Sequence, residues 1–172
     1  MKVPVRKAPA PLGFLSVVER SELGFVGGLL IVNSLARPLE FHCTAPVRPN
    51  RAQEILYGPT LKEFVAGEQI GAALVDHAKA KPALLLTDSA AMLSLRSEHP
   101  TPLVCIDAGE PVAADSETAF NWHGVRIFVR EPGDQQQFEK LWPDYADSVD
   151  LSEPFERIHE ALDEAHRGVK AA

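Results

Sequence analysis

Short apolar runs separated by turn residues dominate the first fifty positions of the chain. The runs at residues 12–19, 24–32 and 39–47 are bounded by clusters of Ser, Asn, Gly or Pro, a pattern that predicts strands. Because the intervening turns are short, we expect these strands to form an antiparallel meander. Residues 29–32 (LLIV) are continuously apolar, which favours a strand that is covered on both faces.

From residue 60 the spacing of the apolar positions becomes that of a helix, predicted over residues 60–80. Thr60 and Glu63 have the spacing of a capping box, in which each side chain satisfies a backbone N–H group of the first turn. Gly67 and Gly71 lie inside this helix, and each costs about 1 kcal/mol relative to alanine. They indicate either close packing on the sheet or a break between two shorter helices.

Two short and strongly apolar runs, residues 82–87 and 103–106, are predicted as further strands. Asp88 and Ser89 follow the first of them and are suited to capping a helix that ends near His99. Strands that are joined through a helix are normally parallel neighbours in one sheet. These two strands after residue 80 should therefore pair in parallel, whereas the first three strands pair antiparallel.

The remaining residues are expected to cover the sheet. We predict a loop over residues 107–119, a partly exposed edge strand over residues 122–129, and a helix from Gly133 that Pro143 stops. Ser152 is suited to capping the last helix. The apolar positions of that helix form one stripe, which consists of Phe155, Ile158, Leu162 and Val169.

Together these elements predict the α/β class. The expected architecture is a mixed sheet with an N-terminal antiparallel three-strand meander, followed by α-β-α-β and by C-terminal helices. A length of 172 residues suits a single domain, which we place over residues 12–172. Residues 1–11 are basic and rich in proline, and we expect them to form a flexible arm.

Charge and composition narrow the classes of partner. The formal net charge is −7, which disfavours broad non-specific binding to nucleic-acid backbones but leaves room for a local basic patch. No apolar run approaches the roughly 20 residues of a membrane helix, so we expect no membrane partner and a cytoplasmic location. Cys43 and Cys105 lie in apolar runs and are predicted to be reduced, buried thiols.

Common catalytic motifs are absent from the sequence, which contains no GxSxG, HExxH or CxxC. Gly27 and Gly28 lead into a strand and not into a helix, so they indicate a bulge or a close backbone approach rather than a phosphate-binding loop. His42 and Cys43 are neighbours in a strand. Their side chains therefore point to opposite faces and cannot bind one ion together.

Three polar residues, His159, Asp163 and His166, fall on one side of the last predicted helix. Side chains at spacings of four and three residues could hold a metal ion. The same side also adjoins the apolar stripe of the helix, where solvated polar residues are normal. The sequence leaves both interpretations open.

Four acidic residues form the remaining candidate site. Glu19 is the last residue of the first predicted strand, Asp88 and Asp107 stand at the ends of the two later strands, and Glu68 lies in the main helix. Since ligands bind at the carboxyl ends of parallel strands, these carboxylates could hold Mg²⁺ or Mn²⁺ for phosphoryl chemistry. The alternative is that each Asp caps the segment after its strand and that Glu68 faces water.

Over about residues 12–107 the order of elements resembles the ribonuclease H-like fold. The segment from YGPT through LLLTD is similar in layout to endonuclease V, in which a helix with a metal-binding Glu precedes a strand that ends in a metal-binding Asp. The resemblance implies those places for Glu68 and Asp88. Two positions depart from the family pattern. The family has an Asp on its first strand, and the nearest candidate here is Glu19. The family also has a Gly after the Asp that ends the later strand, whereas Asp88 is followed by Ser89.

Two hypotheses from different classes follow. The first is a non-enzymatic α/β domain without a cofactor that binds a protein partner or itself, because no motif is complete and the C-terminal helices are amphipathic. The second is a metal-dependent nuclease of ribonuclease H-like type. It would use Glu68 and Asp88 with Glu19 or Asp107, together with Mg²⁺ or Mn²⁺, and only this hypothesis makes nucleic acid a partner.

Overall fold

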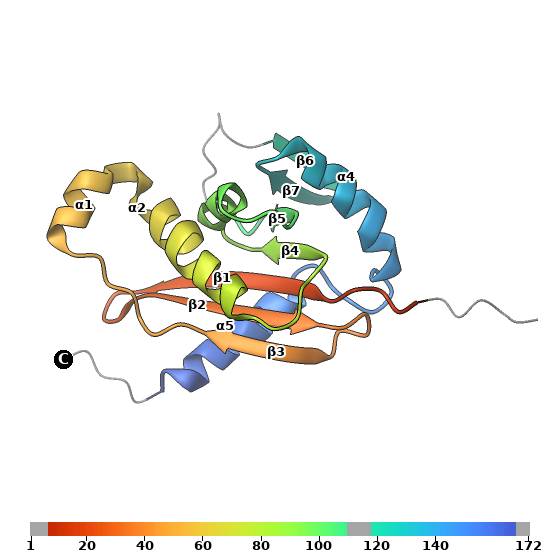
Figure 1. The fold of residues 1–172 in the computed structure, drawn as a ribbon, viewed down its shortest axis with the longest axis horizontal. Coiled ribbons are helices and arrows are strands. Elements are labelled where there is room, and N and C mark those ends of the chain that lie inside the picture. The colour runs from red at the N-terminus through yellow and green to blue at the C-terminus, as the bar shows by residue number, and fades with distance from the viewer. Residues whose placement is uncertain (1–6, 110–117, 168–172) are drawn as a thin grey trace, which may run out of the picture.

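The computed structural model describes residues 7–109 and 118–167. Within these ranges seven strands form one mixed sheet in the order β3-β2-β1-β4-β5-β7-β6 (Figure 1). The strands are β1 (Leu12–Arg20), β2 (Gly24–Val32), β3 (Pro38–Cys43), β4 (Leu84–Thr87), β5 (Leu103–Ile106), β6 (Thr118–Trp122) and β7 (Val125–Val129). As predicted, β1, β2 and β3 are antiparallel neighbours, and β4 and β5 are parallel neighbours. The sequence did not predict that β1 pairs in parallel with β4.

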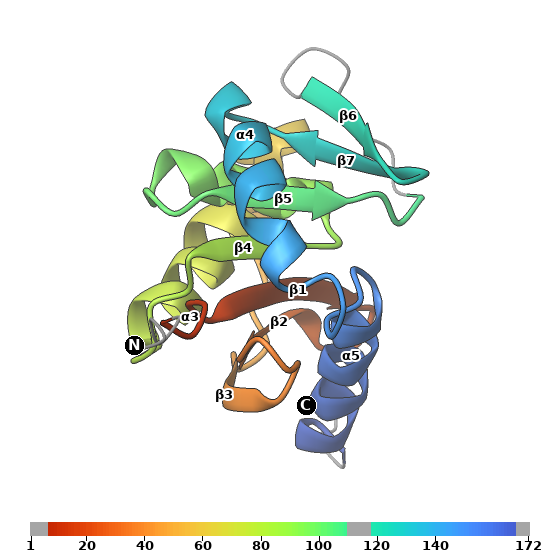
Figure 2. The ribbon, with the colours of Figure 1, turned by 90° about the vertical axis from the view of Figure 1, so that its right-hand side faces the viewer.

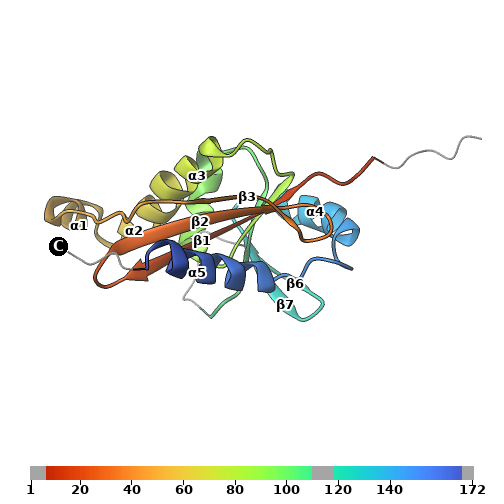
Figure 3. The same cartoon turned by 90° about the horizontal axis from the view of Figure 1, so that it is seen from below.

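Helical segments cover both faces of the sheet (Figure 3). On one face, α2 (Leu61–Glu63), the π-helical η2 (Phe64–Gly71) and α3 (Ala72–His77) form a continuous rod beside the 3₁₀ helix η3 (Ala90–Ser97). On the other face, α4 (Pro132–Leu141) lies over β4 and β5, and α5 (Glu153–Ala165) lies over β1 and β2 (Figure 2). The short helices α1 (Arg51–Tyr57), η1 (Gly58–Thr60) and η4 (Trp142–Asp144) join these elements.

Each face of the sheet therefore has its own apolar core, because alternate side chains of a strand point to opposite faces. Leu15, Leu29 and Leu85 pack against η2 and η3 on one face. Phe14, Leu30 and Leu86 pack against α4 and α5 on the other. The prediction that residues 29–32 are covered on both faces is thus confirmed for β2, and β4 is buried in the same way.

Glycines bring the main helical rod close to its neighbours. A Cβ atom on Gly67 would lie 1.9 Å from Ser94 Oγ, and one on Gly27 would lie 2.1 Å from Ile70 Cγ2. Gly67 and Gly71 allow close packing, but against η3 and not on the sheet as predicted. The close backbone approach predicted at Gly27 is confirmed. The rod continues through these glycines without a break, as an eight-residue π-helical segment between α-helical ends.

The expected capping box at Thr60 is wrong. Thr60 has helical backbone angles because η1 leads directly into α2, and its hydroxyl donates a hydrogen bond back to the Tyr57 carbonyl. A capping box occurs instead ten residues earlier, at α1. There Gln53 N donates to Asn50 Oδ1 at 2.8 Å, and Asn50 N donates to Gln53 Oε1 at 3.0 Å.

Three further expectations need correction. Residues 122–129 are not one strand, because His123 and Gly124 adopt positive φ angles and turn the chain between β6 and β7. Ser89 and Ser152 make no side-chain cap, and the segment after Ser89 is a 3₁₀ helix. Cys43 is exposed, since β3 lies at the edge of the sheet, whereas Cys105 is buried as predicted.

Parts of three other expectations lie outside the described residues. These are Val169 in the last apolar stripe, most of the predicted arm, and residues 110–117 of the predicted loop, after which Thr118 already begins β6. In the part of the chain that the structure covers, none of the helices combines the length and hydrophobicity needed to cross a bilayer.

The Glu40 carboxylate ties β3 to the segment that follows α3. It accepts hydrogen bonds from His42 Nε2 at 2.7 Å, Ala80 N at 2.6 Å and Lys79 N at 3.1 Å. These bonds, with that of His42 the strongest, lower the pKa of Glu40 from 4.5 to about 2. A carboxylate whose pKa falls on folding stabilises the folded state above its ordinary pKa and loses this effect as the pH falls toward the lowered value.

We therefore expect Glu40→Gln to lower the melting temperature at pH 6, and we expect the difference from wild type to shrink between pH 4.5 and pH 2. Thermal unfolding followed by circular dichroism across this range measures the difference. A gap that stays the same at every pH would show that the charge of Glu40 does not contribute.

Candidate functional site at the carboxyl ends of β1 and β4

The candidate site lies where β4 ends beside β1. The last parallel pair is Leu15 with Thr87, and β1 then continues to Arg20 paired only with β2. Asp88, the first residue after β4, lies beside the part of β1 that projects past this point. In open α/β sheets this is the edge at which ligands bind.

Three side chains meet at this edge and form what we call the Asp88 cluster: Ser16 from β1, Asp88 after β4, and His159 from α5. Ser16 Oγ donates to Asp88 Oδ1 at 2.7 Å and lies 2.8 Å from His159 Nε2. His159 Nε2 also lies 3.2 Å from Asp88 Oδ2. Because the Ser16 hydroxyl already donates to Asp88, its oxygen accepts from His159, which assigns a proton to Nε2 of that ring.

The Asp88 cluster is not a serine nucleophile triad. In such a triad the carboxylate binds the ring nitrogen opposite the one that faces the hydroxyl. Here the hydroxyl and the carboxylate both approach Nε2 of His159. Ser16 is also 0% exposed and donates its proton to Asp88, so its oxygen cannot reach a substrate. The cluster instead fixes the orientation of Asp88 from two sides.

Asp88 opens onto a hollow of about 600 Å³, which we call the Asp88 hollow. Its lining comes from β1, β2, α2, α5 and the segments after β4 and β5. The polar residues of this lining are Glu19, Arg20, Lys62, Asp88, Ser89, His159 and Asp163. The hollow therefore mixes anionic and cationic side chains, which suits a ligand with both phosphate and polar groups.

One hydroxyl in this lining lacks a hydrogen-bond partner. Ser89 is 2% exposed, and its Oγ is buried without a partner in the structure. A buried hydroxyl without a hydrogen bond costs about 1–3 kcal/mol. Because the Oγ atom itself is buried, a molecule in the hollow would not contact it, and Ser89 gives no evidence for a ligand.

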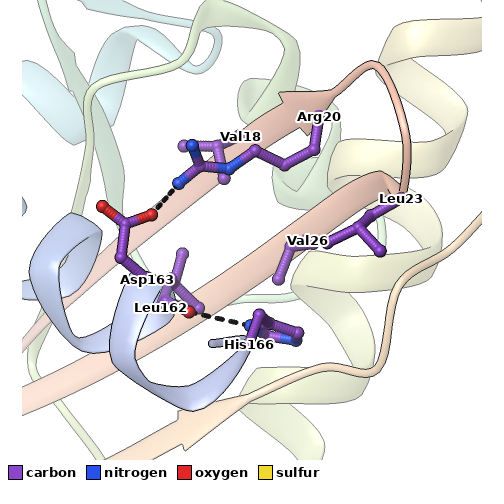
Figure 4. A pocket seen from close by; sticks show the side chains of 7 residues that line it. All are labelled: Val18, Arg20, Leu23, Val26, Leu162, Asp163 and His166. Carbon is purple, nitrogen blue, oxygen red and sulfur yellow. Dashed lines mark hydrogen bonds and ion pairs between the residues drawn. The ribbon is translucent and has the colours of Figure 1, made fainter. Parts of the chain in front are cut away.

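On the α5 side, Arg20 and Asp163 point toward each other and form an ion pair across the mouth of a second, smaller hollow of about 190 Å³ (Figure 4). His166, one turn further along α5, contacts the carbonyl of Leu162 and that of Thr44. His159, Asp163 and His166 therefore face the sheet, but each contacts a different group.

The structure brings together two of the four acidic residues predicted from the sequence. Glu19 and Asp88 both line the Asp88 hollow. Asp107 is exposed, and its carboxylate accepts from Gly109 N at 2.8 Å, as in the capping alternative. Glu68 is exposed on η2 and is not part of the lining. Across residues 7–109 and 118–167, no three His, Cys, Asp or Glu side chains are grouped so that they could hold a metal ion.

Sequence reasoning missed Ser16, Lys62 and Ser89, and it did not connect His159 with Asp88. One signal was present for Ser16, which is a single polar residue inside the apolar run LGFLSVV. A polar side chain buried in a strand requires a partner, and this could have marked position 16 as part of a site. No comparable signal exists for Lys62 or Ser89.

Comparison with known proteins adds information on the fold. No protein-family model matches the chain, and no curated protein matches it. The crystal structure of human endonuclease V matches 92% of this chain and 85% of its own, with a TM-score of 0.50 and 12% sequence identity. A structure of Ciona intestinalis endonuclease V bound to inosine-containing DNA matches 70% of this chain and 69% of its own, with a TM-score of 0.35 and 11% identity.

At this level of identity the first match establishes the fold alone. The chain has a mixed α/β sheet of ribonuclease H-like type, similar to that of human endonuclease V. This confirms the fold class and the fold-level resemblance that the sequence predicted.

Proposed function

We propose that this protein is a metal-dependent phosphodiesterase that acts on nucleic acid, with the Asp88 hollow as its active site. The observation that carries the proposal is the position of Asp88. Its carboxylate stands at the carboxyl end of β4, is oriented by Ser16 and His159, and opens onto a hollow that is also lined by Arg20 and Lys62. The likeness of the fold to that of human endonuclease V supports the same reading.

The donor groups fit one hydrated divalent ion and do not fit a pair of ions. Mg²⁺ commonly binds through one or two carboxylates, substrate phosphates and water. Asp88 can supply one such carboxylate from the lining of the hollow. Glu19 lines the hollow too, but it points to the face of β1 opposite Ser16, the residue that contacts Asp88. A second ion would need further carboxylates close by, but the β1 residue that contacts Asp88 is Ser16, a neutral hydroxyl.

An ion held there would polarise a phosphoryl oxygen and lower the pKa of a bound water. The protein's own residues have simpler tasks. Ser16 and His159 hold Asp88 in one orientation, which reduces the cost of ordering it on binding. Arg20 and Lys62 place positive charge in the lining, where it favours a phosphate group over a neutral one. The proposal gives no role to Glu68 or Asp107, which lie outside the lining.

The experiment compares two acidic residues of the same hollow. Asp88→Asn removes the charge that the ion requires, whereas Asp163→Asn removes a carboxylate that is paired with Arg20 at the rim. At a concentration of Mn²⁺ or Mg²⁺ that is about tenfold above the dissociation constant, the ion should stabilise wild type by about 1.4 kcal/mol. This stabilisation raises the melting temperature by roughly 3–6 °C. Labelled DNA and RNA strands should be cleaved only when the ion is present.

We expect Asp88→Asn to lose both the thermal shift and the cleavage, and Asp163→Asn to retain both. Two results would contradict the proposal: a melting temperature of wild type that divalent ions do not change, or an Asp88→Asn variant that cleaves as wild type does. The first result would favour the non-enzymatic interaction domain that the sequence also suggests.

A further inference from the structure

Strand β3 forms one edge of the sheet, on the side away from β4 and β5 (Figures 1 and 3). Within the described ranges no strand pairs with its outer side. Its apolar side chains are unusually open, since Leu39 is 51% exposed and Phe41 is 37% exposed, and Leu35 in the preceding turn is 59% exposed. Natural edge strands are usually protected by lysines or prolines in the strand; β3 has a proline only at its first residue, Pro38, and residues 39–43 contain neither.

The hydrogen-bond pattern shows which backbone groups of β3 point outward. Thr44 N donates to the carbonyl of Gly27 at 2.9 Å, in line with the register that pairs Cys43 with Gly28. In an antiparallel pair, alternate residues turn their N–H and C=O groups toward the partner strand. Glu40, His42 and Thr44 therefore bond with β2, and the backbone groups of Phe41 and Cys43 face the open side.

We propose that β3 pairs antiparallel with β3 of a second copy of this chain, about a two-fold axis at Phe41. An antiparallel pair of identical strands is compatible with two-fold symmetry, which is the commonest symmetry of homodimers. In this register the two Phe41 residues exchange their outward N–H and C=O groups, and their rings pack on the same face of the joined sheet.

Charge complementarity selects this register over its neighbours. With the axis at Phe41, Glu40 of each copy lies opposite His42 of the other, so an acid faces a base twice. With the axis moved to Glu40, two carboxylates would face each other. With the axis moved to His42, Glu40 would lie opposite Thr44 and would have no base across the interface. Like charges directly opposite in a sheet are destabilising, whereas opposite charges contribute favourably.

A hollow beside the edge adds a second argument. It has a volume of about 380 Å³, and its lining includes Phe41, Cys43, Ala73 and His77. A strand added at the outer side of β3 would lie along this hollow and reduce the exposure of Phe41 and Cys43 together. The inference does not depend on the proposed activity, because neither β3 nor this hollow contributes to the Asp88 hollow.

Sedimentation velocity over a wide range of concentration tests the pairing on the full chain. Wild type should pass from monomer to dimer as its concentration rises. Phe41→Lys should weaken the dimer by roughly 100-fold, because it places two like charges at the axis. Leu56→Lys is the matched control, since Leu56 is 83% exposed on α1, away from β3, and this variant should dimerise as wild type does.

Mixing two variants tests the axis itself. Phe41→Lys and Phe41→Glu should each be monomeric alone and should form a heterodimer when mixed, because only the mixture places opposite charges at the axis. Hydrogen exchange needs no variant: in wild type the amides of Phe41 and Cys43 should be protected at high concentration and exchange freely at low concentration. Any one of four results would overturn the proposal. Wild type could be monomeric at every concentration, or Leu56→Lys could weaken the dimer as much as Phe41→Lys does. The mixture could form no heterodimer, or hydrogen exchange at residue 41 could be independent of concentration.

Discussion

Replacing Ser16 by aspartate is expected to destabilise the protein by about 3–5 kcal/mol at neutral pH in the absence of divalent ions, the usual cost of a buried charge without a partner. Ser16 is fully buried, and its hydroxyl lies 2.7 Å from Asp88. The substitution would exchange a hydrogen-bond donor for a second carboxylate at the same place. His159, at 2.8 Å from Ser16, can compensate only part of the added charge.

The control is Ser16→Asn, which adds nearly the same volume without a charge. The difference between the two variants isolates electrostatic repulsion from the cost of overpacking. Because protonation of either carboxylate removes the repulsion, the difference should decrease as the pH falls. Chemical denaturation of both variants across pH measures it, and equal stability of the two variants at neutral pH would contradict the geometry of the Asp88 cluster.

The same variant also tests whether the cluster can take an ion. Ser16→Asp supplies a second carboxylate beside Asp88, so Mg²⁺ or Mn²⁺ should stabilise it more than they stabilise wild type. Adding Asp88→Asn to Ser16→Asp should abolish this gain. If the ions fail to stabilise Ser16→Asp, the Asp88 hollow is not a cation site, and the proposed activity fails with it.

Replacing Arg96 by methionine should cost about 3 kcal/mol. Asp134, at the start of α4, is 2% exposed and accepts from Arg96 Nε at 2.9 Å and from Leu103 N at 3.2 Å. Without Arg96 this buried carboxylate keeps only a backbone donor, and an uncompensated buried charge typically costs 3–5 kcal/mol. Because the side chain of Arg96 is 22% exposed, water offsets part of the loss.

Removing both partners should restore most of the stability. In Arg96→Met with Asp134→Asn no buried charge is left, and the Asn amide oxygen can still accept from Leu103 N. Urea denaturation of the two single variants and of the double variant gives the coupling energy. The exposed pair of Arg51 and Glu54 is the control, since Arg51→Ala should change the stability by less than about 1 kcal/mol. Similar losses in Arg51→Ala and Arg96→Met would argue against the role of burial.

Most strands could be predicted from local pattern because burial on both faces leaves a continuous apolar run. This holds for residues 29–32 in β2 and for all of β4 and β5. The errors lie where local pattern has more than one physical solution. Residues 122–129 have the composition of a strand, and only the positive φ angles of His123 and Gly124 divide them into a hairpin. Thr60 has the residue type of a helix cap, but the chain is already helical before it.

The candidate site was predictable in part. Asp88 could be located because a polar residue directly after a buried strand lies at the end of the sheet, and Glu19 lies at the same edge by the same logic. Asp107 met the same criterion, and Glu68 was put forward through the resemblance to endonuclease V, but both lie outside the hollow. Position along the chain does not specify the direction in which a side chain points from a helix or a loop.

The apolar pattern by itself determined that this chain is an α/β protein with an antiparallel meander followed by parallel strands. The reason is that a buried helix and a buried strand require different spacings of their apolar residues. Only the tertiary structure decided that Ser16 and His159, 143 positions apart, meet at Asp88 and leave Ser89 without a partner. Contacts at such a separation depend on how α5 packs across β1 and β2. That packing arises from the shape of the whole apolar core, and no local stretch of sequence encodes it.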